Sequence, residues 1–185
     1  MAIKRYYATK DNTITNAFKS NLSTRGVSGN MGQSDVLEVF SIYAQANTSS
    51  SELSRVLIQF DTDKIVTDRT NGVIPASGSV NFFLRMYNAT HSQTTPKDFT
   101  YSFKQFFDTG FENLEINVSH LVEKWITGPG AGGLNNYGFG VQLTSSDETE
   151  QQSYYTKKFF ARGSQYFHKR PVLEARWDNS KKDNR

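Results

Sequence analysis

The chain has 185 residues, a mass of 20.9 kDa and a formal net charge of +3, which suits one domain with a single core. It contains no cysteine, which excludes a disulfide framework, a thiolate zinc site and a cysteine nucleophile. Basic and acidic residues are interspersed, without a basic stripe that could follow a phosphate backbone, so we expect no specific nucleic-acid partner.

Two kinds of apolar segment, a signal-peptide core and a membrane span, are not seen in the sequence. The N-terminal stretch is charged and has no apolar core typical of a signal peptide, and no run in the chain reaches the roughly 18 apolar residues of a membrane span. We therefore expect synthesis in a cytoplasm and no membrane partner. Phenylalanine and tyrosine, with 14 and 9 copies, favour half-buried pleated surfaces, and hence an all-β fold.

The first half of the chain alternates between strand patterns and polar loops. Strands are expected over residues 2–10, 12–18, 36–44, 54–61 and 80–88. The pair Asp11-Asn12 reads as a turn, and residues 19–35 read as a long loop with three glycines. In the fourth strand Val56, Ile58 and Phe60 share one face. The leucine between the first two makes the other face partly apolar, so this strand should lie inside a sheet.

The second half continues the pattern and adds one helix. Strands are expected over residues 99–103, 114–118, 137–144, 154–161 and 167–177, with loops at 89–98 and 143–152. After the second of these strands Ser119 is expected to cap a short helix, because Leu121, Val122, Trp125 and Ile126 recur at helical spacing. Gly138 and Gly140 lie on one face of their strand, where we expect a close packing contact.

These elements predict a jelly-roll-type antiparallel β-sandwich with one short helix, in which the first and last strands pair and protect the edges. One sandwich domain should occupy residues 1–177. Residues 178–185 are polar and charged, and they are typical of a tail or of the start of a linker to a further region.

Five sequence blocks resemble, in their order, the DNRLRE-type jelly-roll domains of bacterial surface proteins and of tailed-phage structural proteins. The blocks are SRVLIQFDTDKI, GSVNFFLRMYN, ENLEINVSHLVEKWITG, NYGFGVQLTSS and YYTKKFFARGSQYFHKRPVLEARW. Three stretches, NMGQSDVLEVFSIYAQ, SYYTKKFFARGSQ and RPVLEARW, look like virion structural proteins of tailed bacteriophages. The resemblance covers nearly the whole chain and implies a location in the virion after synthesis in the host bacterial cytoplasm.

Motifs for chemistry are weak. His91, His120 and His168 have no metal-ligand spacing, and we assign no metal, no cofactor and no catalytic residue. Calcium at Asp61, Asp63 and Asp68 is an alternative, although strand-ending and helix-capping roles are commoner for such residues. The glycine-rich GPGAGG lacks the Lys-Ser/Thr of a phosphate loop.

We therefore expect a non-enzymatic structural component of a tailed-phage virion, in the head decoration, neck, tail or baseplate. Its partners would be other virion proteins in a symmetric multi-copy assembly. The residues expected at interfaces are Arg25, Asn30, Met31, Phe106, Phe107, Tyr154 and Tyr155. One ring of each adjacent aromatic pair should face outward, because neighbouring side chains of an extended chain point to opposite faces. The alternative is a carbohydrate-binding module with a glycan partner, and a weaker one is a polysaccharide hydrolase or lyase.

Overall fold

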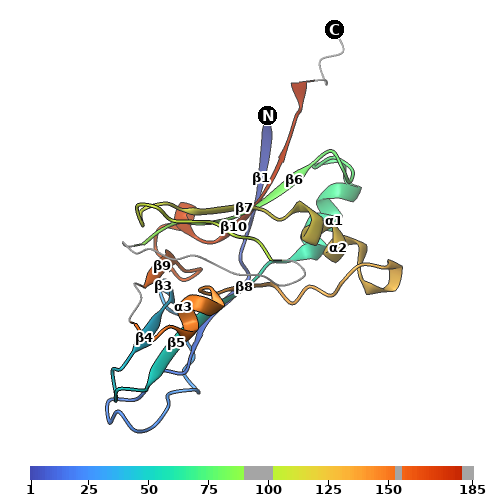
Figure 1. Cartoon of the computed structure of the whole chain (residues 1–185). Coiled ribbons are helices and arrows are strands. Elements are labelled where there is room, and N and C mark those ends of the chain that lie inside the picture. Colours follow the sequence, from blue (N-terminus) through green and yellow to red (C-terminus); the bar gives the residue numbers. More distant parts are fainter. Residues whose placement is uncertain (90–101, 153–155, 181–185) are drawn as a thin grey trace.

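The first and last strands of the chain lie side by side. β1 (Ala2–Tyr7) pairs antiparallel with β10 (Val172–Trp177) along its whole length in this computed structural model, which describes residues 1–89, 102–152 and 156–180. β10 also pairs with β6 (Asn81–Met86), which pairs with β7 (Leu114–Asn117). We call this four-stranded sheet, drawn across the upper part of Figure 1, sheet A. The predicted pairing of first and last strands is confirmed.

A second sheet, sheet B, is built around β5 (Ser51–Gln59). β5 pairs antiparallel with β2 (Lys10–Thr15), β4 (Ser41–Tyr43) and β8 (Phe139–Val141), so it is the internal strand that its sequence predicted. β3 (Val36–Val39) and β9 (Lys157–Phe160) form a separate antiparallel pair. A bridge between Asn88 and Phe159 joins this pair to the end of β6. The fold is therefore an all-β antiparallel sandwich with short helices.

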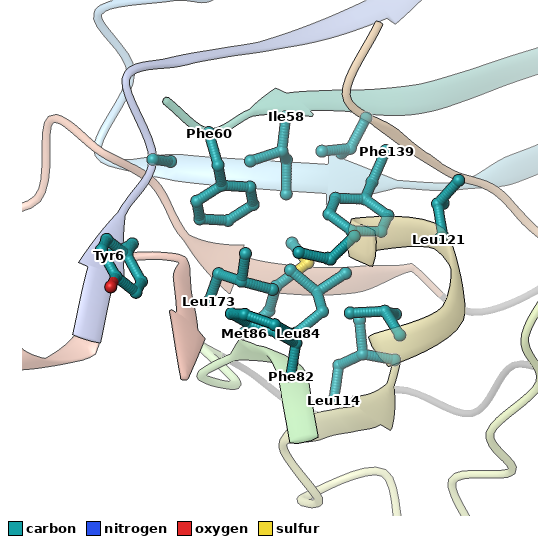
Figure 2. Packing of buried hydrophobic residues seen from close by; sticks show 14 of the residues in the cluster. Tyr6, Ile58, Phe60, Phe82, Leu84, Met86, Leu114, Leu121, Phe139 and Leu173 are labelled. Atoms are coloured by element: carbon teal, nitrogen blue, oxygen red, sulfur yellow. The ribbon is translucent and has the colours of Figure 1, made fainter. Parts of the chain in front are cut away.

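The core lies between the sheets. Figure 2 shows Ile58 and Phe60 from the β5 side facing Phe82, Leu84 and Met86 of β6. All five side chains are buried, as the period-two pattern predicted. Each contributes about 1.5 to 3 kcal/mol through its removal from water. Leu173 of β10, Leu114 of β7 and Leu121 of the second helix extend the same cluster (Figure 2).

The predicted helix after residue 118 is present as α2 (Ser119–Thr127). Its capping was predicted wrongly. Ser119 is the first helical residue, and its hydroxyl accepts a hydrogen bond from the Phe82 N–H at 2.8 Å. The hydroxyl thus connects α2 to β6 and leaves the helix end uncapped.

Two further helices were not indicated by periodicity. α1 (Thr62–Thr70) begins after Asp61, whose carboxylate accepts hydrogen bonds from the N–H groups of Asp63 and Lys64. α3 (Ser145–Thr149) is capped by Thr144 and lies in the expected loop 143–152. The 3-10 helices are η1 (Pro129–Ala131) and η2 (Phe167–Lys169). None of the helices in the described ranges is both long and apolar enough to span a membrane.

Several strand boundaries differ from prediction for identifiable reasons. Asp11 and Asn12 lie inside β2, because the Asp11 carboxylate accepts a hydrogen bond from the Arg162 N–H and so makes a tertiary contact in place of a turn. The expected last strand starts only after Pro171, and its first part is η2. The expected strand 36–44 divides into β3 and β4, which pair with different partners.

Two predicted strands lie partly outside the described residues. Most of the expected strand 99–103 lies outside them, and residues 102–103 belong to no strand. The strand expected over 154–161 is present as β9 from Lys157. Loop 19–35 contains no strand or helix, as expected, and only an isolated bridge joins Phe18 to Arg25.

Candidate functional site: an exposed aromatic surface at one end of sheet A

The loop that precedes β7 separates two neighbouring phenylalanines. Phe107 is buried and packs against Phe159, with 6.3 Å between ring centres. Phe106 is 62% exposed. The expectation that one ring faces each way is therefore met at this pair. Phe107, which was also expected at an interface, is buried, and its ring fills the core.

A buried lysine fixes this loop. The Lys157 Nζ atom donates hydrogen bonds to the carbonyl oxygens of Gly110 and Glu112, at 2.7 and 3.0 Å. It also lies 4.3 Å from the centre of the Phe107 ring, within the range of a cation–π contact. Burial lowers the pKa of Lys157 to about 8, although the Glu112 carboxylate raises it in part. No sequence pattern indicated this role, because position 157 alternates as an ordinary strand residue.

The same loop displays a second aromatic ring. Phe111 is 59% exposed, next to the carbonyl that Lys157 binds. Asn88 adds two contacts: its side-chain amide donates to the Gly110 oxygen at 3.3 Å, and its N–H donates to the Asn113 side chain at 2.9 Å. The loop is thus tied to β9 and to the chain just after β6, so Phe106 and Phe111 are presented from a fixed backbone.

A turn before β10 carries two more exposed rings. Tyr166 and Phe167 are 46% and 55% exposed. Lys169 Nζ lies 4.9 Å from the Phe160 ring centre and 5.3 Å from that of Tyr166. The Arg170 guanidinium lies 5.2 Å from the centre of the Phe167 ring. We call residues 166–170 the basic–aromatic turn.

Strand register places the loop and the turn at the same end of sheet A. The loop leads into Leu114, which is opposite Met86, and the turn leads toward Val172, which is opposite Arg85. β9 connects the two, since its first residue holds the loop and its last residue packs on Tyr166. The four exposed rings of Phe106, Phe111, Tyr166 and Phe167 therefore gather at one end of the sheet, and we call this region the end surface.

An ion-pair network lies on the outer face of sheet A. Glu174, which is fully buried, binds Arg5 at 2.8 Å, Arg85 at 3.2 Å and Arg176 at 2.6 Å. Glu115 pairs with two of these, Arg85 and Arg176, at 2.8 and 2.7 Å. Burial alone would raise the pKa of Glu174, but the three guanidinium groups outweigh burial and hold this pKa below its ordinary value. The network thus connects β1, β10, β6 and β7 through their side chains.

A cavity of about 440 Å³ opens beside β7 and β8. Its described lining is mainly apolar and contains no aspartate, glutamate or histidine. Two cations line it, and both have partners: Arg55 binds Glu148 through hydrogen bonds of 3.0 and 2.6 Å, and Lys157 binds the loop carbonyls. This lining can enclose an apolar group, but it offers no acid–base pair for hydrolysis or elimination.

The other residues expected at an interface differ in their positions. Arg25 has an internal role, because its guanidinium donates to the carbonyls of Asn16 and Ser51 and lies 3.7 Å from the centre of the Phe18 ring. Asn30 and Met31 are exposed. Arg162 donates to the Gly32 carbonyl at 3.3 Å, so their loop lies beside the chain that leads to the basic–aromatic turn. Tyr154 and Tyr155 lie outside the described residues.

The residues considered for metal binding are dispersed or otherwise engaged. Asp61 caps α1, and Asp68 accepts a hydrogen bond from the Tyr6 hydroxyl and pairs with Lys4. His120 lies in α2 and His168 in the turn, and His91 is outside the described residues. Within ranges 1–89, 102–152 and 156–180, no three His, Cys, Asp or Glu side chains cluster as a metal site requires.

Comparison with known proteins does not assign this chain to a family. A scan against protein-family models finds no match for this chain, and a search of curated proteins finds none either. The resemblance to jelly-roll domains of phage particles therefore rests on the sequence blocks themselves.

Proposed function

We propose that the protein is a non-enzymatic structural component of a tailed-phage virion and acts by protein–protein assembly. The observation that carries this proposal is the end surface, where four exposed aromatic rings gather on a fixed backbone. The sequence blocks that resemble phage virion proteins support the particle as its setting. Head decoration, neck and tail or baseplate are the positions that this role covers.

The physical argument concerns what exposed aromatic rings do. Phenylalanine and tyrosine are enriched at protein interfaces, because each ring buries a large area and has few rotatable bonds to restrict. Lys157 holds the loop of Phe106 and Phe111 before any partner arrives. Such preorganisation reduces the ordering cost of association. A surface of this kind gives firm attachment when many copies act together, even where a single contact is weak.

The test measures incorporation into particles. Phe106→Ser with Phe111→Ser removes both rings of the loop and leaves the Lys157 hydrogen bonds to main-chain carbonyls. Tyr137→Ser is the matched control, since Tyr137 is 86% exposed and lies outside the end surface. We expect the double variant to fold, as judged by circular dichroism, and to be lost from purified particles, whereas the control is incorporated normally. Normal incorporation of a folded double variant would refute the role of the end surface.

The carbohydrate-binding alternative is tested with the same proteins. Selective binding of a glycan by the isolated chain would favour that alternative, and the variants show whether this binding depends on the end surface. Without such binding, the assembly proposal stands on the incorporation result.

A further inference from the structure

Several cations in the described part of this chain have acidic partners. Besides the pairs of Glu174 and Glu115, ion pairs join Lys4 to Asp68, Arg55 to Glu148, Arg69 to Glu123, Lys158 to Glu38 and Arg162 to Asp11. Arg162 and Lys158, which come just before the turn in sequence, are both compensated.

The basic–aromatic turn concentrates cations that lack such partners. His168, Lys169 and Arg170 follow one another, and none of them forms an ion pair with any described residue. The sequence from residue 157 to residue 171 contains no aspartate or glutamate at all. The turn therefore carries a local excess of positive charge that the protein itself leaves uncompensated.

The cations of the turn are held in place by rings. Lys169 lies over Phe160 and Tyr166, whose rings meet edge to face with centres 5.6 Å apart. Arg170 lies over Phe167, and its Nε atom donates to the Ser164 carbonyl at 2.9 Å. Both cations are half-buried. Their positive groups therefore have more defined positions than those of fully exposed side chains.

The same contacts indicate which class of ligand the turn can bind. Sugars and nucleic-acid bases stack on open ring faces, but here the cations cover ring faces, and Phe167 also contacts the Tyr7 ring at 4.4 Å. A nucleic acid further requires a basic track along its phosphates, and the neighbouring cations Lys158 and Arg162 are already paired. A short acidic peptide needs neither an open ring face nor a basic track. Its carboxylates require only the few cations of the turn.

We propose that the basic–aromatic turn binds an acidic segment of a neighbouring protein, with carboxylates on Lys169 and Arg170 and an apolar side chain against the exposed part of Phe167. This inference rests on the proposed function only in taking that neighbour to be a particle subunit. Carboxylates form charge-assisted hydrogen bonds with such cations. Because the turn is at the surface, salt should weaken binding.

The test uses the purified full chain and a fluorescent peptide rich in glutamate with a central phenylalanine. Lys169→Ala and Phe167→Ala are compared with two controls: Lys19→Ala, an exposed lysine elsewhere, and Tyr137→Ala, an exposed ring elsewhere. Fluorescence anisotropy should show binding about 5- to 10-fold weaker in each turn variant and unchanged in both controls. Circular dichroism and thermal melting confirm that the variants fold. Equal binding by all folded variants would overturn the proposal.

Two competitors test which chemical class of ligand the turn prefers. An oligothymidylate and an oligogalacturonate, each with the net charge of the peptide, should compete much more weakly than unlabelled peptide. Preferential binding of either competitor, or no binding of the peptide at low salt, would overturn the proposal. Peptide binding and particle incorporation are separate readouts: a chain that binds the peptide but is absent from particles refutes the proposed function alone, and the reverse result refutes this inference alone.

Discussion

The ammonium group of Lys157 lies 4.3 Å from the centre of the Phe107 ring, inside the protein. The ring is part of the core, and the ammonium group reaches past it to two carbonyls of the loop that displays Phe106 and Phe111. One buried side chain thereby couples the core to the exposed aromatic surface.

The first prediction concerns the order of this loop. Lys157→Met keeps an unbranched chain in the cavity wall but removes both hydrogen bonds. Each such bond contributes about 1 kcal/mol, so amide hydrogen exchange of residues 108–113 should become roughly tenfold faster or more. Lys158→Met is the control, because Lys158 is partly exposed and pairs with Glu38 on the other side of β9. Unchanged exchange in Lys157→Met would contradict the anchoring role.

The second prediction concerns pH. The pKa of Lys157 falls from 10.5 to about 8 in the folded protein, so between these values the unfolded chain holds a proton that the folded protein has lost. Stability from this group is therefore fully present above pH 10.5 and is lost as the pH falls through 8. The unfolding free energy of the protein, minus that of Lys157→Met, should rise across this window by at most about 1.4 kcal/mol per pH unit. Urea titrations at several pH values measure this difference, and a difference that fell with pH would be contrary to the burial of a charged lysine.

The third prediction compares Gly138, just before β8, with Gly140 inside β8. Gly138 has a φ of +82°, and a Cβ atom there would lie 2.2 Å from the Ile58 carbonyl oxygen, whereas a Cβ at Gly140 meets nothing within 4 Å. Gly138→Ala should cost about 2 kcal/mol or more, and Gly140→Ala should stay within about 0.5 kcal/mol of the parent protein. Thermal unfolding of both variants checks this contrast. Equal melting temperatures would show that the close contact at Gly138 is absent.

The fourth prediction compares two phenylalanines. Phe60 is buried and contacts the Phe139 ring edge to face at 5.9 Å. Phe60→Ala should lower the unfolding free energy by about 3 to 5 kcal/mol through lost burial and an unfilled cavity. Phe106→Ala should change it by less than about 0.5 kcal/mol, because that ring faces solvent. Unchanged urea midpoints in Phe60→Ala would contradict its place in the core.

Period-two patterns predicted the central strands well, because burial of one face leaves a direct trace in the sequence. Val56 and Ile58 in β5 and Phe82 and Leu84 in β6 are buried as expected. The close contact expected at two glycines is confirmed at Gly138 only. Local patterns could not reveal tertiary uses of polar residues: Asp11 binds Arg162, and Ser119 binds β6.

The candidate surface was predicted less completely. The pair of adjacent rings at 106 and 107 identified one exposed position, but it did not say which. Phe111, Tyr166 and Phe167 lie outside the strands, so no alternation in the sequence distinguishes their exposed rings from core rings. The anchoring role of Lys157 depends on carbonyls more than 40 residues away in sequence, which spacing alone cannot indicate.

The most direct test of the central claim is quantitative mass spectrometry of gradient-purified phage particles from cells that carry this gene. The assembly role predicts that the chain co-purifies with the particles at a constant copy number relative to the major particle protein. Particles that are infectious and contain none of the chain, together with an isolated protein that binds or cleaves a glycan, would contradict it.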